Sequence, residues 1–334
     1  MDISGTGKSL VRMAYERCLG VVPEENILII TLGKFKGIIN EQIPELPKEN
    51  LLLEPYARRT APCIAYATYT LLKRNPDAVM AATPADIIVN DEQLFKETMT
   101  HALDYAEKNP VLVTLGVKPD RPDTEYGYIQ AVGGKGACSS GDPVKVKTFT
   151  EKPDAEIADV FFRSGEFFWN SGIFVWQASV IKEEMERYIP EITRLFDGWE
   201  GALGSPAEEV FIERAYTDCI KLSIDYGVME KTDRAWVYPI QFGWSDIDSW
   251  ENYYSSIRSK DQDGNISNTQ MKILQNDKRN IILTKNKNKL LMIRGLEDCL
   301  VVDTDDVLLI CPHDDKQYKE LVNSTRMPGY DKYR

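Results

Sequence analysis

Short apolar runs alternate with amphipathic stretches over the first two thirds of the chain, and this alternation limits the fold more than any other feature. The apolar runs span residues 27–30, 51–53, 78–82 and 111–115, and all but the third are rich in Ile, Leu and Val. The stretches with helical spacing span residues 9–19, 60–72 and 91–106. Continuous apolar runs are typical of strands buried on both faces, and strands that alternate with helices form βαβ units. The sequence therefore predicts an α/β fold, with a Rossmann-like domain built on a mostly parallel sheet.

The pattern changes beyond residue 255. Residues 260–265 are polar and rich in turn-forming residues. They are followed by short strand-like runs at 281–283, 290–293, 299–302 and 307–310. We therefore predict two domains, an α/β domain over residues 1–255 and a small β-rich C-terminal domain over residues 256–334.

The charge and cysteine content exclude several classes of partner. The chain contains 40 Lys and Arg residues against 52 Asp and Glu residues, a net charge of −12. Proteins that bind the phosphate backbone of nucleic acids need a basic surface, so we expect no nucleic-acid partner. No apolar run approaches the ~18 residues of a membrane span, and the first ten residues lack the apolar core of a secretory leader. The six cysteines form no C-x-x-C pair, as is typical of thiols in a reducing compartment, so we expect a cytoplasmic protein without a membrane partner.

Two short motif fragments have simpler interpretations than binding sites. Gly5-Thr6-Gly7-Lys8-Ser9 resembles the end of a phosphate-binding P-loop, but too few residues precede it to form the strand that such a loop requires. Asp261-Gln262-Asp263-Gly264 resembles part of a calcium loop, but Ser259 and Gln270 stand where the full loop has acidic residues. We interpret the first fragment as the start of a helix and the second as a turn.

Two aspartates follow extended segments and are candidates for a metal site. Asp86 follows the apolar run that ends at residue 82, and Asp246 follows Phe242-Gly243-Trp244. Ligands of open α/β sheets bind at the carboxyl ends of strands, and two carboxylates completed by water and substrate phosphates are typical of Mg²⁺. Each aspartate taken alone has a simpler interpretation, because Asp commonly caps the start of a helix. The spacing leaves both interpretations open.

A further group of polar residues lies at the ends of extended stretches. It consists of Tyr126-Gly127-Tyr128, Glu151-Lys152-Pro153 and Trp169-Asn170-Ser171-Gly172. A neutral amide, a carboxylate and a glycine that permits close approach suit the hydroxyls of a sugar, and a neighbouring lysine suits a phosphate oxygen. Each segment alone is an ordinary turn, so the hypothesis of a sugar-phosphate site depends on their occurring together.

These segments occur in an order that resembles the mannose-1-phosphate guanylyltransferases, a family of bacterial sugar nucleotidyltransferases. The motifs that carry the resemblance are Glu54-Pro55-x-x-Arg58-Arg59-Thr60-Ala61-Pro62, Thr83-Pro84-Ala85-Asp86, Tyr126-Gly127-Tyr128-Ile129, Phe149-Thr150-Glu151-Lys152-Pro153, Trp169-Asn170-Ser171-Gly172-Ile173-Phe174, Ser223-Ile224-Asp225-Tyr226 and Phe242-Gly243-Trp244-Ser245-Asp246. The resemblance covers nearly the whole chain. Any one motif is weak, whereas their complete order is specific.

The resemblance implies an enzyme that converts GTP and mannose 1-phosphate into GDP-mannose and pyrophosphate. No protein nucleophile is needed, because the sugar phosphate is already an anion and catalysis consists of positioning and charge neutralisation. The resemblance implies that Asp86 and Asp246 hold Mg²⁺ and that these two residues and Lys152 are catalytic. It implies that Gly127, Glu151 and Asn170 bind the mannose and that Lys152 binds its phosphate. It also implies that the nucleotide is bound by Glu54, Arg58 and Thr60.

The chain also departs from the family pattern. The family begins with a strand and a glycine-rich loop that wraps the triphosphate, and the resemblance implies that both are missing here. Arg59 stands where the family usually has Asn, and Asp248 stands where it usually has Gly. Two alternatives therefore stay open: a non-catalytic paralogue that binds sugar phosphate or a partner, and a sugar nucleotidyltransferase for a different sugar or base. A homodimer and the role of the C-terminal domain are also left open.

Overall fold

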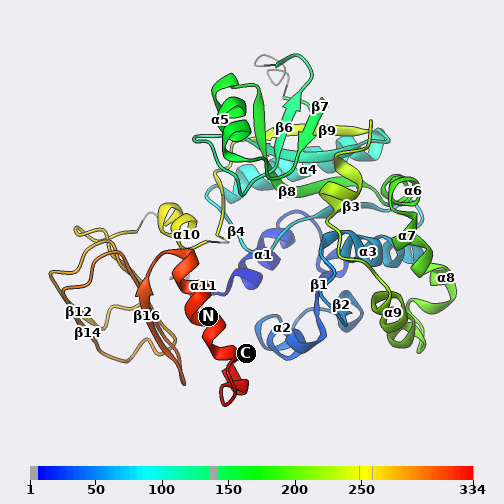
Figure 1. The fold of residues 1–334 in the computed structure, drawn as a ribbon. Helices are drawn as coiled ribbons and strands as arrows, with labels where there is room; N and C mark the ends of the chain where they lie inside the picture. Colours follow the sequence, from blue (N-terminus) through cyan, green and yellow to red (C-terminus); the bar gives the residue numbers. More distant parts are fainter. Residues whose placement is uncertain (1–6, 135–140, 248, 258, 334) are drawn as a thin grey trace. The chain divides into compact units, whose positions relative to one another are not determined.

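The computed structural model describes residues 7–134, 141–247, 249–257 and 259–333 (Figure 1). The chain divides into two compact units. The larger unit comprises Tyr15–Pro84 and Val89–Trp244, and the smaller unit comprises Met1–Ala14, Ala85–Ile88 and Ser245–Arg334. Asp248 and the first part of the glycine-rich Gly5–Ser9 fragment lie outside the described residues.

The larger unit contains the alternating elements that the sequence predicts. Its strands are β1 (Ile29–Leu32), β2 (Leu51–Glu54), β3 (Val79–Ala82), β5 (Leu112–Val117), β6 (Tyr128–Ala131), β7 (Val144–Thr150), β8 (Phe167–Gln177) and β9 (Ala235–Ile240). Its helices are α2 (Lys36–Gln42), α3 (Thr60–Arg74), α4 (Glu92–Lys108), α5 (Ala155–Ser164), α6 (Ala178–Tyr188), α7 (Pro190–Thr193), α8 (Trp199–Ala202), α9 (Glu208–Thr217) and a π-helical turn (Asp225–Met229), and α1 (Leu10–Leu19) spans residues of both units. The four predicted apolar runs correspond to β1, β2, β3 and β5, and the three predicted helices correspond to α1, α3 and α4.

Six strands of the larger unit form one sheet, in the order β3-β8-β5-β9-β7-β6, and the start of β8 also pairs with β6. Strands β3, β5, β6 and β9 run in one direction, and β7 and β8 run in the other. The α/β class and the shared direction of most strands confirm the prediction. Among the described residues of this sheet, however, only β5 and β9 are parallel neighbours, while β1 and β2 form a separate parallel pair. An apolar run predicts a buried strand without specifying the direction of its neighbours.

Strand β8 and helix α4 show how local sequence builds this unit. The first half of β8 alternates between buried and half-buried residues, and Ile173–Trp176 is buried throughout. Helix α4 packs against β3, β5 and β8 (Figure 1). It begins after Asp91, whose side chain accepts a hydrogen bond from the Leu94 N–H at 2.9 Å and so satisfies a free amide of the first turn. The fully buried Trp176 lies in the main core beneath these elements.

The smaller unit consists mainly of parallel strands that stack as successive coils. Its elements are α10 (Trp250–Ser256), β11 (Ile266–Ser267), β12 (Lys272–Gln275), β13 (Ile281–Thr284), β14 (Leu291–Arg294), β15 (Cys299–Asp303), β16 (Leu308–Pro312) and α11 (Asp315–Asn323), while β4 (Ile87–Val89) and β10 (Trp244–Asp246) span residues of both units. Strands β11, β13 and β15 pair in parallel, β16 adds an antiparallel edge, and β12 pairs in parallel with β14. The predicted β-rich character is confirmed, and β13 to β16 match the four predicted runs.

Buried asparagines connect successive coils of the smaller unit. The main-chain N–H and the Nδ2 of Asn280 both donate to Asn265 Oδ1 at 3.0 Å, and Asn280 Oδ1 accepts the Cys299 N–H at 2.9 Å. In the same way, Asn268 Oδ1 accepts the Thr284 N–H at 2.8 Å, and Asn268 Nδ2 donates to the Thr284 carbonyl at 3.0 Å. These amides satisfy main-chain groups where the coils turn, which a buried segment requires.

Helix α10 packs with the C-terminal strands. Tyr253 and Ile257 share a core cluster with Ile266, Ile281 and Leu300. The compact unit in the structure accordingly resumes at Ser245. The division into domains 1–255 and 256–334 stays a prediction from the sequence.

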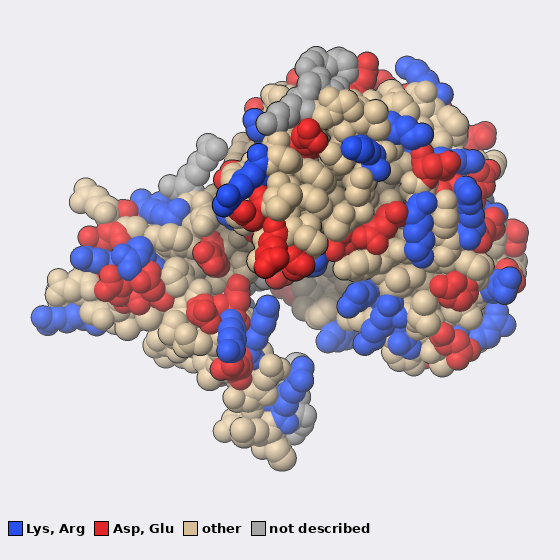
Figure 2. Space-filling model, turned by 45° about the horizontal axis from the view of Figure 1, so that its top comes forward, with Lys and Arg blue, Asp and Glu red and all other residues tan. Residues whose placement is uncertain are grey.

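The surface is mixed in charge on the face shown in Figure 2, where acidic and basic side chains are interspersed. The whole chain nevertheless carries an acidic excess of 52 residues over 40. Within the described ranges, no helix combines the length and the apolar character needed to cross a membrane.

Candidate functional site

Three predicted sugar-binding residues lie together in or directly beside adjoining strands of the larger unit. Tyr128, the first residue of β6, pairs with Thr150 of β7 on one side and with Trp169 of β8 on the other. Gly127 directly precedes Tyr128, so the same register places it between Glu151 and Asn170. The Asn170 N–H donates to the Gly127 carbonyl at 2.8 Å. The strand register thus brings together residues from three separate motifs.

The space beside Gly127 is filled by its two partners. A Cβ atom at this position would lie 2.4 Å from Glu151 Oε2 and 3.3 Å from Asn170 Cβ. A side chain at position 127 would therefore displace the Glu151 carboxyl group. Because glycine has no side chain, Glu151 and Asn170 can both lie close to position 127 and to the same ligand group.

Aromatic residues fix the backbone around Gly127. Tyr126 and Tyr128 are both buried and belong to one cluster with Trp169. The ring centroid of Tyr126 lies 4.9 Å from that of Trp169 and 5.4 Å from that of Trp244. Such ring contacts add to the burial of large apolar surfaces. The segment is consequently anchored on both sides of the glycine.

Glu151 has the properties of a carboxyl group prepared for a ligand. Its Oε2 atom is buried and has no hydrogen-bond partner among the described residues. Burial raises the pKa of Glu151 to about 7, with the nearby charges of Asp225 and Glu230 adding to this effect and Lys152 opposing it. Near neutral pH the group can therefore accept or donate a hydrogen bond.

Lys152 directly follows Glu151 and holds a strained backbone conformation, with φ at 44°. Its Nζ lies 3.8 Å from Glu125 Oε2, and both side chains are largely exposed, at 48% and 65%. Exposed ion pairs of this kind contribute little to stability and exchange readily with other ions. The ammonium group is therefore accessible to an anionic ligand, as the predicted phosphate role requires.

Asp225 is a residue of this cluster to which the sequence assigned no role. It begins the π-helical turn, is 9% exposed, and accepts a hydrogen bond from Asn170 Nδ2 at 2.8 Å. Burial raises its pKa above the ordinary value. The available signal was an acidic residue inside the Ser223-Ile224-Asp225-Tyr226 motif, but its partner lies 55 residues away in sequence.

The three predicted nucleotide-binding residues have partners within the protein. Arg58 Nε and Nη2 donate to the carbonyls of Tyr216 at 3.0 Å and Thr217 at 3.1 Å, the last residues of α9. Glu54 Oε1 accepts the Tyr216 hydroxyl at 2.9 Å, and Thr60 Oγ1 accepts a main-chain N–H at 2.9 Å. Burial raises the pKa of Glu54, and the bond from Tyr216 opposes that shift. Glu54 and Arg58 therefore both contact the end of α9, and Thr60 contacts the Ile224 N–H beyond it.

The two predicted metal ligands lie in the smaller unit, at one end of a short strand pair. Asp86 directly precedes β4, and Asp246 is the last residue of β10, which pairs with β4. The Ile247 N–H donates to the Asp86 carbonyl at 3.3 Å. Among the described helices, neither aspartate is a cap: Ser249 caps α10, and Asp91 caps α4. The helix-cap interpretation of Asp86 and Asp246 is therefore wrong.

Two carboxylates at the same end of a strand pair suit one mode of metal binding. Within the residues that the structure describes, no group of three or more His, Cys, Asp or Glu side chains is placed to hold an ion alone. Mg²⁺ is commonly bound by one or two carboxylates, with water and substrate phosphates completing its octahedral shell. The oxygen donors of Asp86 and Asp246 fit this mode, in which the substrate supplies part of the coordination.

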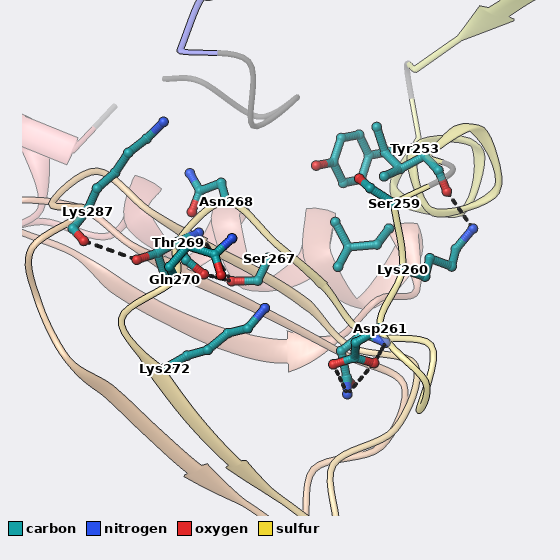
Figure 3. Close-up of a pocket in the computed structure, with 13 residues that line it drawn as sticks. Tyr253, Ser259, Lys260, Asp261, Ser267, Asn268, Thr269, Gln270, Lys272 and Lys287 are labelled. Carbon is teal, nitrogen blue, oxygen red and sulfur yellow. Dashed lines mark hydrogen bonds between the residues drawn. The ribbon is translucent and has the colours of Figure 1, made fainter.

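A separate cavity of about 580 Å³ lies in the smaller unit (Figure 3). Its lining is mostly polar and includes Lys260, Lys272 and Lys287, but none of the predicted site residues. The ammonium groups of these lysines lie apart in Figure 3 and do not converge on one point. The Lys260 ammonium instead donates to the Ile257 carbonyl at 2.7 Å. The cavity is thus distinct from the residues that the sequence singled out.

Comparison with known proteins connects these residues to a family. The family model described as nucleotidyl transferase matches residues 3–263. The mannose-1-phosphate guanylyltransferase of Escherichia coli K12 is 34% identical over 323 residues, which cover 93% of this chain and 65% of the relative. The mannose-1-phosphate guanylyltransferase RfbM of Salmonella typhimurium is 31% identical, over 99% of this chain and 69% of the relative.

A solved structure agrees with these sequence matches. The structure from Thermus thermophilus described as mannose-1-phosphate geranyltransferase has a TM-score of 0.81 and 27% identity, over 96% of this chain and 90% of that one. The chain spans slightly less than two thirds of the length of the E. coli relative. It belongs to the nucleotidyl transferase family, and within that family it is similar to the mannose-1-phosphate guanylyltransferases.

Proposed function

We propose that this protein transfers GMP from GTP to mannose 1-phosphate, giving GDP-mannose and pyrophosphate, with Mg²⁺ as cofactor. The observation that carries the proposal is the cluster of Gly127, Glu151 and Asn170, in which a buried, unpaired carboxyl oxygen faces a glycine that leaves no room for a side chain. The names of the similar proteins support the same reaction. We expect it to take place in the cytoplasm.

The reaction exchanges one phosphorus–oxygen bond for another. A phosphate oxygen of mannose 1-phosphate attacks the α-phosphorus of GTP, and the bond between that phosphorus and the oxygen bridging to the β-phosphorus breaks. The bonding electrons leave with pyrophosphate. Because the attacking group is already an anion, the protein has to align the substrates and stabilise the charge that develops in the transition state.

Mannose 1-phosphate binds through its sugar and its phosphate separately. In this proposal the sugar hydroxyls contact Gly127, Glu151 and Asn170, and the phosphate contacts Lys152. Lys152 gives up its exposed ion pair with Glu125, whose oxygen lies 3.8 Å away. The positive charge then offsets part of the repulsion between two phosphate groups that must approach each other.

Asp86 and Asp246 are the residues proposed to hold Mg²⁺. Members of the nucleotidyl transferase family generally use a divalent metal ion, and two carboxylates that leave room for phosphate ligands suit Mg²⁺. When bound, the ion would neutralise charge on the phosphates. The β4–β10 pair and the hydrogen bond from the Ile247 N–H to the Asp86 carbonyl hold the main chain beside both aspartates.

Glu54, Arg58 and Thr60 are proposed to contact the nucleotide. Arg58 uses Nε and Nη2 to hold the end of α9, which leaves Nη1 to donate to a ligand. The Thr60 hydroxyl accepts a main-chain N–H and keeps its own proton as a donor. Glu54 keeps one carboxyl oxygen beyond its bond with the Tyr216 hydroxyl. Each residue thus combines a structural contact with an unused polar atom.

The test is the release of pyrophosphate from GTP, Mg²⁺ and mannose 1-phosphate, with each component omitted in turn. Asp86→Asn and Glu151→Gln serve as variants of the metal and sugar sites. We expect release that requires all three components and falls in both variants. The other nucleoside triphosphates and glucose 1-phosphate, tested in place of GTP and mannose 1-phosphate, separate the proposed specificity from that of related enzymes.

Two results would contradict the proposal in different ways. Binding of mannose 1-phosphate in calorimetry without pyrophosphate release would favour the non-catalytic alternative. Faster release with another sugar phosphate or another nucleotide would keep the transferase chemistry but replace its substrates.

A further inference from the structure

The hydrogen bonds of Asn170 leave only one orientation for its side-chain amide. Asn170 Oδ1 accepts the Thr114 hydroxyl at 3.1 Å and the Gly172 N–H at 3.2 Å. Asn170 Nδ2 donates to Asp225 Oδ1 at 2.8 Å. The Gly172 main chain can only donate at its N–H, and an ionised Asp225 can only accept, so a flipped amide would face mismatched groups on both sides.

This orientation determines what Asn170 offers to a ligand. Its oxygen is already used by two donors, and one of its two N–H bonds is used by Asp225. The second N–H is the group that Asn170 can present. Thr114 is fully buried and Asp225 is 9% exposed, so the hydrogen bonds that hold the amide are largely protected from competition with water.

Glu151, the other residue that borders Gly127, presents the opposite kind of group. Its unpaired Oε2 lies 2.4 Å from the point that a Cβ of Gly127 would take, and Asn170 Cβ lies 3.3 Å from that point. A carboxylate oxygen accepts a hydrogen bond, whereas the Asn170 N–H donates one. A single hydroxyl group is the simplest ligand that can donate to the first and accept from the second.

We propose that Asp225 is a positioning residue of the sugar site, which fixes the Asn170 amide so that the site presents one N–H donor beside one carboxyl acceptor to a single sugar hydroxyl. The inference rests on the proposed function, because it assumes that Gly127, Glu151 and Asn170 bind the sugar. Asp225 itself touches Asn170 and acts through it. A substitution of Asp225 therefore does not alter any residue that is proposed to contact the sugar.

The charge of Asp225 supplies a second readout. The ionisable groups that act on Glu151 are Asp225 and Glu230, which raise its pKa together with burial, and Lys152, which lowers it. Removal of the Asp225 charge alone therefore lowers the pKa of Glu151. The pH dependence of sugar binding therefore reports the Asp225 charge beside Glu151, separately from the hydrogen bond that Asp225 accepts from Asn170.

The experiment measures the Kd of mannose 1-phosphate by calorimetry for the wild type and for three substitutions. Asp225→Ala removes the acceptor for Asn170, Asp225→Asn keeps an acceptor oxygen without the charge, and Asp233→Ala is a control at an exposed acidic residue. We expect Asp225→Ala to raise Kd roughly ten-fold, the effect of one well-formed hydrogen bond. We expect Asp225→Asn to stay within about three-fold of the wild type, and the control to match the wild type.

Two further measurements keep the test decisive. In Asp225→Asn, the inflection that Glu151 gives to the pH dependence of Kd should move to lower pH. Deoxy analogues of mannose 1-phosphate identify the hydroxyl concerned: one analogue should bind more weakly than mannose 1-phosphate to the wild type but equally to Asp225→Ala. If Asp225→Ala does not fold, Asp225→Leu replaces it, because it fills more of the buried space while still removing the acceptor of the Asn170 amide.

The inference is overturned if Asp225→Ala, or Asp225→Leu in its place, binds mannose 1-phosphate as the wild type does, or if every deoxy analogue loses the same factor in both proteins. An Asp225→Asn protein with an unmoved inflection also contradicts it. Failure of the proposed function looks different, since the wild type would then bind no mannose 1-phosphate or release no pyrophosphate. The calorimetric comparison needs no turnover.

Discussion

The carboxyl group of Glu151 occupies the space that a side chain at position 127 would need, with Oε2 only 2.4 Å from the Cβ that Gly127 lacks. This contact joins a residue before β6 to a residue after β7 and depends on the register between those strands. The choice of residue at position 127 is therefore restricted by the space that the Glu151 side chain occupies.

Gly127→Ala should weaken binding of mannose 1-phosphate by at least about ten-fold, because the new methyl group pushes the Glu151 carboxyl group out of place. The KM for GTP should change little. Steady-state kinetics with each substrate varied in turn measure both values. Gly37→Ala is the matched control, since a Cβ there meets no atom within 4 Å, and it should leave both KM values unchanged. Equal KM values for mannose 1-phosphate in Gly127→Ala and the wild type would contradict the assignment.

Glu151→Gln should make the protein more stable at pH 8 but not at pH 4. The pKa of Glu151 is raised from 4.5 to about 7, chiefly by burial. Between these values the unfolded chain ionises Glu151 while the folded chain keeps the proton, so the free energy of unfolding falls as pH rises. Glu151→Gln cannot ionise at this position and does not lose this stability. Above pH 7 its free energy of unfolding should exceed that of the wild type by an amount on the order of 1–3 kcal/mol. Urea unfolding at both pH values measures the difference, and a gain that is the same at pH 4 and pH 8 would exclude titration as its cause.

Asp86→Asn and Asp246→Asn should each raise the Mg²⁺ concentration needed for half-maximal pyrophosphate release by roughly ten-fold or more, because a neutral amide is a weaker ligand for a hard cation than a carboxylate. The melting temperature without Mg²⁺ should change little for Asp86→Asn, since Asp86 is exposed. Asp104→Asn, an exposed substitution on α4, is the control. An unchanged Mg²⁺ response in both variants would remove these residues from the metal site.

Arg58→Ala should lower the free energy of unfolding by about 1–2 kcal/mol, because it removes two hydrogen bonds from a cation to the last carbonyls of α9. Arg58→Lys should lose less, since it keeps the charge at the helix end without the planar fork. Chemical denaturation of both variants provides the comparison. A wild-type stability for Arg58→Ala would show that these bonds are not significant, and Arg58 would then act only on the nucleotide.

Local patterns were sufficient to predict β1, β2, β3, β5, α1, α3, α4 and the strands β13 to β16, but not the bounds of the remaining elements. The apolar run at 111–115 became β5 and the helical spacing at 91–106 became α4, because each pattern reflects burial along one segment. The direction of β8 could not be predicted in this way. Its residues Ile173–Trp176 are buried throughout, and a fully buried strand has the same composition whether its neighbours are parallel or antiparallel.

The candidate site shows the same limit. Gly127, Glu151 and Asn170 were singled out by residue type and by resemblance, but their meeting point depends on the register of β6 with β7 and β8. Asp225 was missed as a member of the site because its contact with Asn170 spans 55 residues and leaves no periodic signal. Arg58 was predicted to bind nucleotide, and its bonds to the end of α9 became apparent only in three dimensions.

The buried asparagines of the smaller unit have an evolutionary consequence. Equivalent strand positions are separated by 15 residues between Ile266 and Ile281 and by 19 residues between Ile281 and Leu300. Coil length therefore varies while Asn280 keeps its bonds to Asn265 and to the Cys299 N–H. Insertions and deletions in the exposed loop between β13 and β14 should accumulate freely among homologues, whereas one extra residue between Asn265 and Ile266 would separate Asn265 from the two hydrogen bonds that Asn280 donates to it.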